Sequence, residues 1–184
     1  MCAQKKTLGY KERCPDQRAA YCTQLAEIKQ CGKTLVYVDE SGFQAESIRR
    51  YAYAPKGQRV FDLISSQRFR KTTLVAARIA DKFTAATLFE GSCNAERFTQ
   101  WLEQELCPRL CCNHVVIMDN ARSHKTKRTR VLIESSGATL MYLPPYSPDY
   151  NPIEHDFATL KRSREYNPDK PLEDIIQMYQ SLLA

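Results

Sequence analysis

The stretch Val115-Val116-Ile117-Met118-Asp119 consists of four apolar residues followed by a carboxylate. A fully apolar run of this kind is typical of a β-strand that is buried on both faces of a sheet. A carboxylate at the end of such a strand is costly unless it faces solvent, a partner or a metal ion. The stretch therefore predicts a central strand whose terminal acid needs an explanation.

A second run with the same ending precedes it in the chain. The β-branched and aromatic segment from Leu35 to Asp39 predicts a strand, and its alternation places Leu35, Tyr37 and Asp39 on one face. If the two strands are neighbours in the sheet, Asp39 and Asp119 lie close together and repel each other. A divalent cation between the two carboxylates would relieve that repulsion.

Each acid also has a simpler interpretation, which the sequence leaves open. Asp39 precedes Ser41-Gly42 and suits a turn, and Asp119 suits an Asx turn or the cap of the next helix. A third acid, Glu154, matches a capping box with Asn151, at the start of a helix predicted over residues 151–165. On that helix Glu154 borders the apolar stripe, a position from which it can face a site beside the core.

Other polar residues compete with these three acids. Glu40 is expected on the opposite sheet face from Asp39, and Asp149 lies in a proline-rich loop. His124 follows Asp119 closely enough to touch a bound phosphate, but a structural or auxiliary role is the simpler interpretation. No helical H-x-x-x-H pair supports a histidine metal site.

The remaining patterns predict a helix capped by Asp16, an antiparallel strand pair, and then helices alternating with strands. The hairpin joins residues 72–80 to 83–89, and Asn94 caps the helix that follows it. A meander of strands followed by alternating helices and strands implies an α/β fold, a mixed sheet with helices packed on its faces. We expect three segments: an N-terminal arm and helix (1–32), the main domain (33–165) and a C-terminal helix (166–184).

Composition narrows the class of partner. Lys and Arg number 27 against 21 Asp and Glu, a net charge of +6, which favours a polyanionic partner such as nucleic acid. The eight cysteines contain no C-x-x-C pair, and the polar, basic start has no apolar signal segment, so we expect a reducing, cytoplasmic compartment. No apolar run approaches the ~20 residues that span a bilayer, so no membrane partner is expected.

Three ordered motifs carry a family resemblance. They resemble the DDE transposases of the mariner-like superfamily, specifically the bacterial insertion sequence 630 family, and 34 residues separate Asp119 from Glu154, as in that group. The resemblance covers roughly residues 33 to 165. The motifs are Val36-Tyr37-Val38-Asp39-Glu40-Ser41-Gly42-Phe43, Val116-Ile117-Met118-Asp119-Asn120-Ala121-Arg122-Ser123-His124, and Leu143-Pro144-Pro145-Tyr146-Ser147-Pro148-Asp149-Tyr150-Asn151-Pro152-Ile153-Glu154.

The resemblance implies an RNase H-like fold, a mixed five-stranded sheet with helices on both faces. It also implies that Asp39, Asp119 and Glu154 are catalytic and bind two Mg²⁺ ions, for which Mn²⁺ can substitute. Such enzymes hydrolyse phosphodiesters at transposon ends and join the freed 3′-hydroxyls to target DNA. Two alternatives remain open: a catalytically silent remnant or DNA-binding regulator with the same fold, and an RNase H-like nuclease that only hydrolyses.

The expected partner is double-stranded DNA, both transposon ends and target, bound by a homodimer associated with the bacterial nucleoid. Family members usually carry helix-turn-helix domains ahead of the catalytic domain, whereas about 30 residues precede the first strand here. A separate or frameshift-fused helix-turn-helix subunit would supply end recognition. Basic side chains near the acids are the candidate phosphate contacts: Lys125, Lys127, Arg128, Lys161 and Arg162.

Overall fold

The structure is a computed structural model that describes residues 11–44, 53–61 and 71–183. Residues 1–10 of the predicted N-terminal arm, together with residues 45–52, 62–70 and 184, lie outside the described residues. The elements, in chain order, are α1 (Pro15–Gln30), β1 (Thr34–Gln44), β2 (Lys71–Ile79), β3 (Lys82–Glu90), α2 (Ala95–Trp101), the π-helix Leu102–Leu106, the 3-10 helix Cys107–Arg109, β4 (His114–Met118), α3 (Lys127–Ser135), β5 (Thr139–Tyr142), the 3-10 helix Pro148–Tyr150, α4 (Ile153–Tyr166) and α5 (Leu172–Leu182).

The strands form one five-stranded sheet in the order β3-β2-β1-β4-β5. β1 pairs with β2 and β2 with β3 in antiparallel fashion, whereas β4 is parallel to both β1 and β5. The predicted mixed five-stranded sheet and its antiparallel hairpin are therefore confirmed. The antiparallel strands β2 and β3 are joined by a tight turn between Ile79 and Lys82, whereas the parallel strands β4 and β5 are joined through α3.

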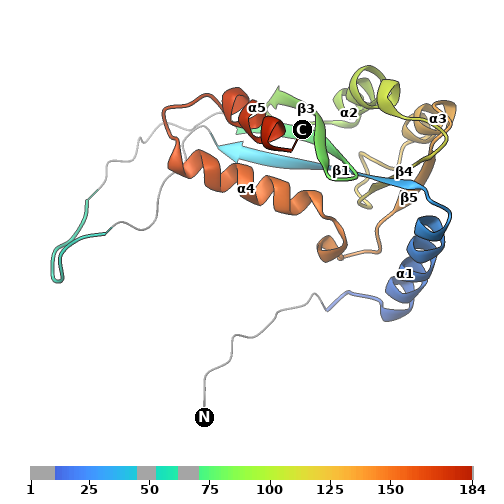
Figure 1. The fold of residues 1–184 in the computed structure, drawn as a ribbon, viewed down its shortest axis with the longest axis horizontal. Helices are drawn as coiled ribbons and strands as arrows, with labels where there is room; N and C mark the ends of the chain where they lie inside the picture. The colour runs from blue at the N-terminus through green and yellow to red at the C-terminus, as the bar shows by residue number, and fades with distance from the viewer. Residues whose placement is uncertain (1–10, 45–52, 62–70, 184) are drawn as a thin grey trace, which may run out of the picture.

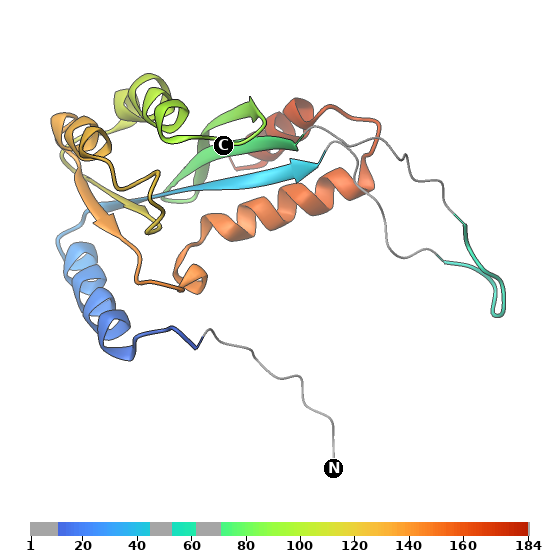
Figure 2. The ribbon, with the colours of Figure 1, turned by 180° about the vertical axis from the view of Figure 1, so that it is seen from behind.

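Helices cover both faces of the sheet, as predicted (Figures 1 and 2). One core packs α1, α4 and α5 against the face that carries Tyr37 and Ile117. The second core packs α2, the π-helix and α3 against the face that carries Val36 and Val116. The alternation of side chains along β1 and β4 separates the two cores, since successive residues point to opposite faces.

Three predicted element boundaries differ from the structure. β1 continues past Asp39 to Gln44, because the antiparallel partner β2 pairs with it along that whole length. α1 is not capped by Asp16: Pro15 opens it, and its N-cap residue Cys14 makes no side-chain cap bond. α4 begins at Ile153 rather than at Asn151, because a separate 3-10 turn ends at Tyr150.

The C-terminal helix is tied to the sheet by a buried acid. Asp156 of α4, 1% exposed, accepts hydrogen bonds from Arg78 of β2 (2.7 Å) and from Tyr179 of α5 (2.5 Å). A buried carboxylate is tolerated when it is paired and hydrogen-bonded in this way. α5 also contributes Leu172 and Ile175 to the first core, so it packs as part of the domain.

Seven described cysteines are all free thiols. Among the residues that the structure describes, no helix combines the length and apolarity needed to cross a membrane.

Candidate active site

The pairing of β1 with β4 sets Asp39 beside Asp119. The parallel register runs from Thr34 opposite His114 to Val38 opposite Met118, and the next step along both chains reaches the two aspartates. β4 ends at Met118, so β1 continues alone on that side of the sheet. A cavity of about 430 Å³ opens where β4 stops.

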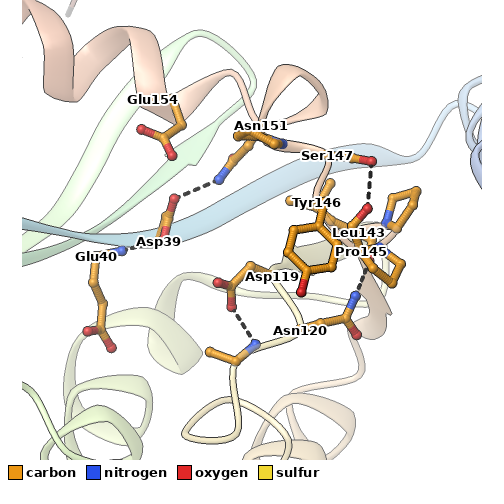
Figure 3. Close-up of a pocket in the computed structure, with 13 residues that line it drawn as sticks. Asp39, Glu40, Asp119, Asn120, Leu143, Pro145, Tyr146, Ser147, Asn151 and Glu154 are labelled. Carbon is orange, nitrogen blue, oxygen red and sulfur yellow. Dashed lines mark hydrogen bonds between the residues drawn. The ribbon is translucent and has the colours of Figure 1, made fainter. Parts of the chain in front are cut away.

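Three carboxylates approach this cavity from three elements, as Figure 3 shows. Asp39 comes from the middle of β1, Asp119 from the residue after β4, and Glu154 from the first turn of α4. The sheet and α4 therefore bring together residues that are up to 115 positions apart, from 39 to 154. The complete lining is Asp39, Glu40, Asp119, Asn120, Ala121, Leu143, Pro144, Pro145, Tyr146, Ser147, Pro148, Asn151 and Glu154.

Asp39 lies in the most enclosed part of the site. Its Oδ1 accepts the backbone N–H of Glu40 (2.7 Å), and its Oδ2 accepts Nδ2 of Asn151 (2.8 Å), as Figure 3 shows. Burial raises the pKa of Asp39 to about 7; the Glu40 N–H opposes this rise, while the charges of Glu154 and Asp119 add to it. Asp39 is therefore a carboxylate whose ionised form gains from a nearby cation.

Asp119 is held differently, by its own loop. Its Oδ1 accepts the backbone N–H of Ala121 (2.9 Å) and Nδ1 of His124 (2.6 Å). Burial acts to raise the pKa of Asp119, but these hydrogen bonds and the nearby His124 and Lys125 charges outweigh it, and the pKa is lowered. Its side chain remains 47% exposed, so the carboxylate is available to a ligand in the cavity.

His124 is buried between two acids. Only 2% of it is exposed, and its Nε2 lies 3.2 Å from Oε1 of Glu40, while Nδ1 faces Asp119. Burial would lower the pKa of His124, but the hydrogen bonds to Asp119 and Glu40 raise it to about 9. The suggested contact between His124 and a phosphate is wrong, because the ring does not reach the surface.

Several simpler interpretations of the acids are also wrong. Asp39 is not a turn residue, since it pairs with Ala76 inside the β1/β2 ladder. Glu154 and Asn151 form no capping box, because Asn151 directs its amide to Asp39 and α4 has no side-chain cap. For Asp119 the Asx-type bond to Ala121 is present, but α3 is capped by Thr126.

Glu40 lies on the opposite sheet face from Asp39, as expected: its ladder partner Val75 belongs to the second core, whereas Ala76, opposite Asp39, belongs to the first. Glu40 follows Asp39 on the strand, yet both line the same cavity. The reason is that β4 ends at Met118, so side chains from both faces of β1 reach the space beyond it. Through His124, Glu40 is connected to Asp119, and the sequence pattern did not predict that connection.

The proline-rich loop between β5 and α4 forms one wall of the cavity and is held by α1. Asp149 accepts hydrogen bonds from Arg18 (2.7 Å) and Arg13 (2.9 Å), which removes it from the set of cavity acids. The Arg18 guanidinium also lies 4.0 Å from the ring centroid of Tyr150. Within this loop Tyr146 adopts a positive φ of 53°, a conformation that non-glycine residues rarely adopt.

The candidate phosphate contacts are all exposed, but they do not form one group. Lys125 and Lys127 line a second, shallow cavity of about 550 Å³ together with Arg130 and Tyr142. Arg128 instead pairs with Glu103 at 3.0 Å. The other two candidates, Lys161 and Arg162, are on α4.

The donor chemistry of the cavity suits a hard divalent cation. Asp39, Asp119 and Glu154 offer carboxylate oxygens, the ligands that Mg²⁺ and Mn²⁺ prefer. Within the described residues, no three His, Cys, Asp or Glu side chains already form a complete metal-binding cluster. The pKa of Asp39 is nevertheless raised, first by burial and further by the charges of Glu154 and Asp119, so a cation in the cavity would favour its ionised form.

Solved structures share this fold. The chain matches the pre-cleavage Mos1 transpososome with a TM-score of 0.73 and 19% identity, over 100% of this chain and 59% of that one. It matches the Mos1 strand transfer complex with a TM-score of 0.67 and 20% identity, over 99% and 63%. The isolated catalytic domain of Mos1 mariner transposase matches with a TM-score of 0.60 and 16% identity, over 98% and 85%.

The chain thus spans about 59% of the length of the transpososome chain to which it is similar. A search of curated protein sequences gives no match. The model of the DDE superfamily endonuclease family matches residues 34–176, which include the whole sheet, α4 and all three cavity carboxylates. This chain belongs to the DDE superfamily endonuclease family.

Proposed function

We propose that this chain is the catalytic part of a DDE transposase, and that Asp39, Asp119 and Glu154 are its catalytic carboxylates. The observation that carries the proposal is the convergence of these three acids, from β1, the end of β4 and α4, on one cavity. The family match and the fold shared with Mos1 transposase support it. The three motifs and the 34 residues between Asp119 and Glu154 support the insertion sequence 630 group.

Asp39, Asp119 and Glu154 would hold two Mg²⁺ ions. Mos1 has been solved in paired end complexes with Mg and with Mn, which supports the choice of ion. When bound, two such ions would activate an attacking oxygen and stabilise the leaving oxygen of a phosphodiester. Asp39 would gain from a neighbouring cation, because burial and the charges of Glu154 and Asp119 disfavour its ionised form.

The reaction has two substitutions at phosphorus. In hydrolysis, water forms a new bond to phosphorus, the bond to the 3′-oxygen breaks, and the freed 3′-hydroxyl takes up a proton. In strand transfer, that 3′-hydroxyl attacks a phosphodiester of target DNA and displaces another 3′-oxygen. The chain's part is to fix the carboxylates: Asn151 and the Glu40 N–H orient Asp39, and the loop after β4 orients Asp119.

DNA would pass the α3 side of the cavity, through the shallow groove lined by Lys125, Lys127 and Arg130. Phosphate contacts of this type give affinity without sequence selectivity. Tyr142 adds an aromatic surface beside the Lys125 ammonium, which lies 5.2 Å from the ring centroid. Arg128 contributes less to this path, since Glu103 already pairs with it; Lys161 and Arg162 extend the path along α4.

Double-stranded DNA, as transposon ends and target, is the proposed partner, and a homodimer is the proposed assembly. Mos1 has been solved as a transpososome and in paired end complexes, which supports both. Residues 33–165 would form the catalytic domain, with 1–32 and 166–184 as N- and C-terminal additions. A helix-turn-helix subunit, separate or fused by frameshift, would recognise the ends, and the enzyme would act at the bacterial nucleoid.

A cleavage and joining assay tests the proposal. Asp39→Asn, Asp119→Asn and Glu154→Gln should each lower Mg²⁺-dependent nicking by at least ~10³-fold, because each removes ligand charge at nearly constant shape. Glu173→Gln is the matched control, since Glu173 is exposed on α5 and is not part of the cavity lining.

Each outcome of this assay discriminates among the three functional classes. Nicking without joining would indicate a purely hydrolytic nuclease, and DNA binding without either reaction would indicate a silent remnant. Equal activity in the control and in the three variants would refute the assignment of the carboxylates.

A further inference from the structure

The loop after β4, which holds Asp119, contains a buried histidine, His124. His124 is 2% exposed, and its ring packs on Phe98 of α2 with 4.2 Å between centroids. Its backbone carbonyl accepts the hydroxyl of Tyr142 (3.2 Å), and its N–H donates to the carbonyl of Ala121 (3.1 Å). The imidazole is therefore fixed by packing and by the backbone before any ligand binds.

The two ring nitrogens face different acids. Nδ1 lies 2.6 Å from Oδ1 of Asp119, and Nε2 lies 3.2 Å from Oε1 of Glu40. Both hydrogen bonds to Asp119, from the ring and from the N–H of Ala121, reach the same oxygen. The other oxygen of this half-exposed carboxylate is left to the cavity.

We propose that His124 is a positioning residue for the reaction in this cavity: Glu40 holds its ring through Nε2, and the ring holds Asp119 through Nδ1 so that Oδ2 faces a bound divalent cation. The inference rests on the proposed function in one respect, namely that the ligand in the cavity is a divalent cation. Partners that orient a metal-binding carboxylate in this way typically change metal affinity or activity by 10–100-fold when they are removed.

The geometry separates this role from simple packing. In His124→Asn the side-chain amide nitrogen takes the place of Nδ1 and keeps a donor for Asp119. In His124→Gln the amide nitrogen takes the place of Nε2 and keeps a donor for Glu40. His124→Phe retains the contact with Phe98 and loses both donors. A purely structural histidine predicts the smallest loss for Phe, whereas the positioning role predicts the smallest loss for Asn.

The experiment measures Mn²⁺ binding to the whole chain by calorimetry, alongside nicking as a function of Mn²⁺ concentration. We expect about 10-fold weaker Mn²⁺ binding in His124→Phe and His124→Gln, and a loss of about 3-fold or less in His124→Asn. His155→Gln is the control, because His155 is an exposed imidazole next to Glu154. Circular dichroism checks that each variant folds.

Equal Mn²⁺ affinity in His124→Asn and His124→Gln would overturn the inference, as would unchanged affinity in His124→Phe. If the unmodified chain itself binds no Mn²⁺, the proposed function fails instead. If the variants do not fold, nitrogen NMR of the unmodified chain can still test the role of His124. Mg²⁺ should shift the Nδ1 resonance of His124 by acting on Asp119, and Mg²⁺ that binds without any such shift would contradict the positioning role.

Discussion

The two aspartates of the cavity both follow the last residue pair of β1 and β4, Val38 and Met118, but different kinds of contact hold them. Asp119 is fixed by residues two and five positions further along the same loop. Asp39 is fixed by Asn151, which lies 112 positions away on the proline-rich loop. Arg18 holds that loop by donating hydrogen bonds to Asp149, 131 positions further along the chain. The direct contacts of Asp119 are thus local, whereas Asp39 combines a local contact, the Glu40 N–H, with one from a distant part of the chain.

Their electrostatics differ in the same way. The pKa of Asp119 is lowered because donors surround it, including the His124 ring. The pKa of Asp39 is raised to about 7 because burial and two neighbouring carboxylates oppose its ionisation. Asp119 is therefore ionised at little cost in free energy, whereas ionising Asp39 is costly. A bound cation would offset the cost at Asp39.

Outside the three carboxylates themselves, the largest expected effect comes from adding charge beside Asp39. Asn151→Asp would set a second carboxylate against Asp39 in place of the amide that donates to it. We expect nicking to fall by at least ~10²-fold and the metal-free chain to lose ~2–4 kcal/mol of stability, because two buried carboxylates would repel each other in addition to the loss of the hydrogen bond. Asn151→Ser, which removes the amide without adding charge, is the control. Similar losses in both variants, measured by urea unfolding and by nicking, would mean that charge is not the cause.

The second prediction concerns the direction in which two matched substitutions change the stability of the metal-free chain at pH 8. Asp119→Asn should destabilise it by about 1–3 kcal/mol, since His124 loses a charged partner. Asp39→Asn should be neutral or stabilising, because it removes a costly charge. In addition, the new amide can donate to Oδ1 of Asn151, which is buried and has no hydrogen-bond partner among the described residues. The measurement is urea unfolding of both variants with a chelator present. Equal losses of stability in the two variants would contradict the proposed difference between the two acids.

The pH dependence of stability sharpens the same contrast. Because the folded-state pKa of Asp39, about 7, lies above its usual value of 3.8, its ionisation costs stability as pH rises from about 4 through 7. Asp119 has a lowered pKa, so its contribution is present above its usual value and is lost as pH falls below about 4. With a chelator present, the stability of Asp39→Asn should therefore increase relative to that of the unmodified chain as the pH rises from 4 to 8. A constant difference over that range would show that Asp39 does not titrate there.

The smallest expected effect lies furthest from the cavity. Arg18→Ala removes the bidentate contact with Asp149 and the contact with the Tyr150 ring, so the loop that carries Asn151 should loosen. We expect a loss of ~1 kcal/mol in stability and a few-fold reduction in nicking. Hydrogen exchange should rise around residues 146–151 and stay unchanged at residues 119–124. Equal increases in both loops would show that α1 supports the whole site rather than the Asp39 side.

Sequence patterns determined much of this molecule by themselves. The apolar runs ending in Asp39 and Asp119 indicated two strands, and these strands, the hairpin and the Asn94 cap are present as predicted. These features are set by neighbours a few residues apart, through alternation, turn chemistry and helix capping. The motifs around the three acids, and the spacing between them, likewise indicated the family from the sequence alone.

Only the tertiary structure decided what surrounds each acid. Asn151 matched a helix cap and instead holds Asp39, and Glu40, on the far face as expected, is connected to Asp119 through His124. No local pattern separates these alternatives, because the same side chain suits both. The choice depended on where β4 ends beside β1 and on how α1 and the proline-rich loop pack, which are contacts between residues 80 to 131 positions apart. Such long-range packing fixes the burial of Asp39, and this burial raises its pKa, so that its charged form depends on a nearby cation.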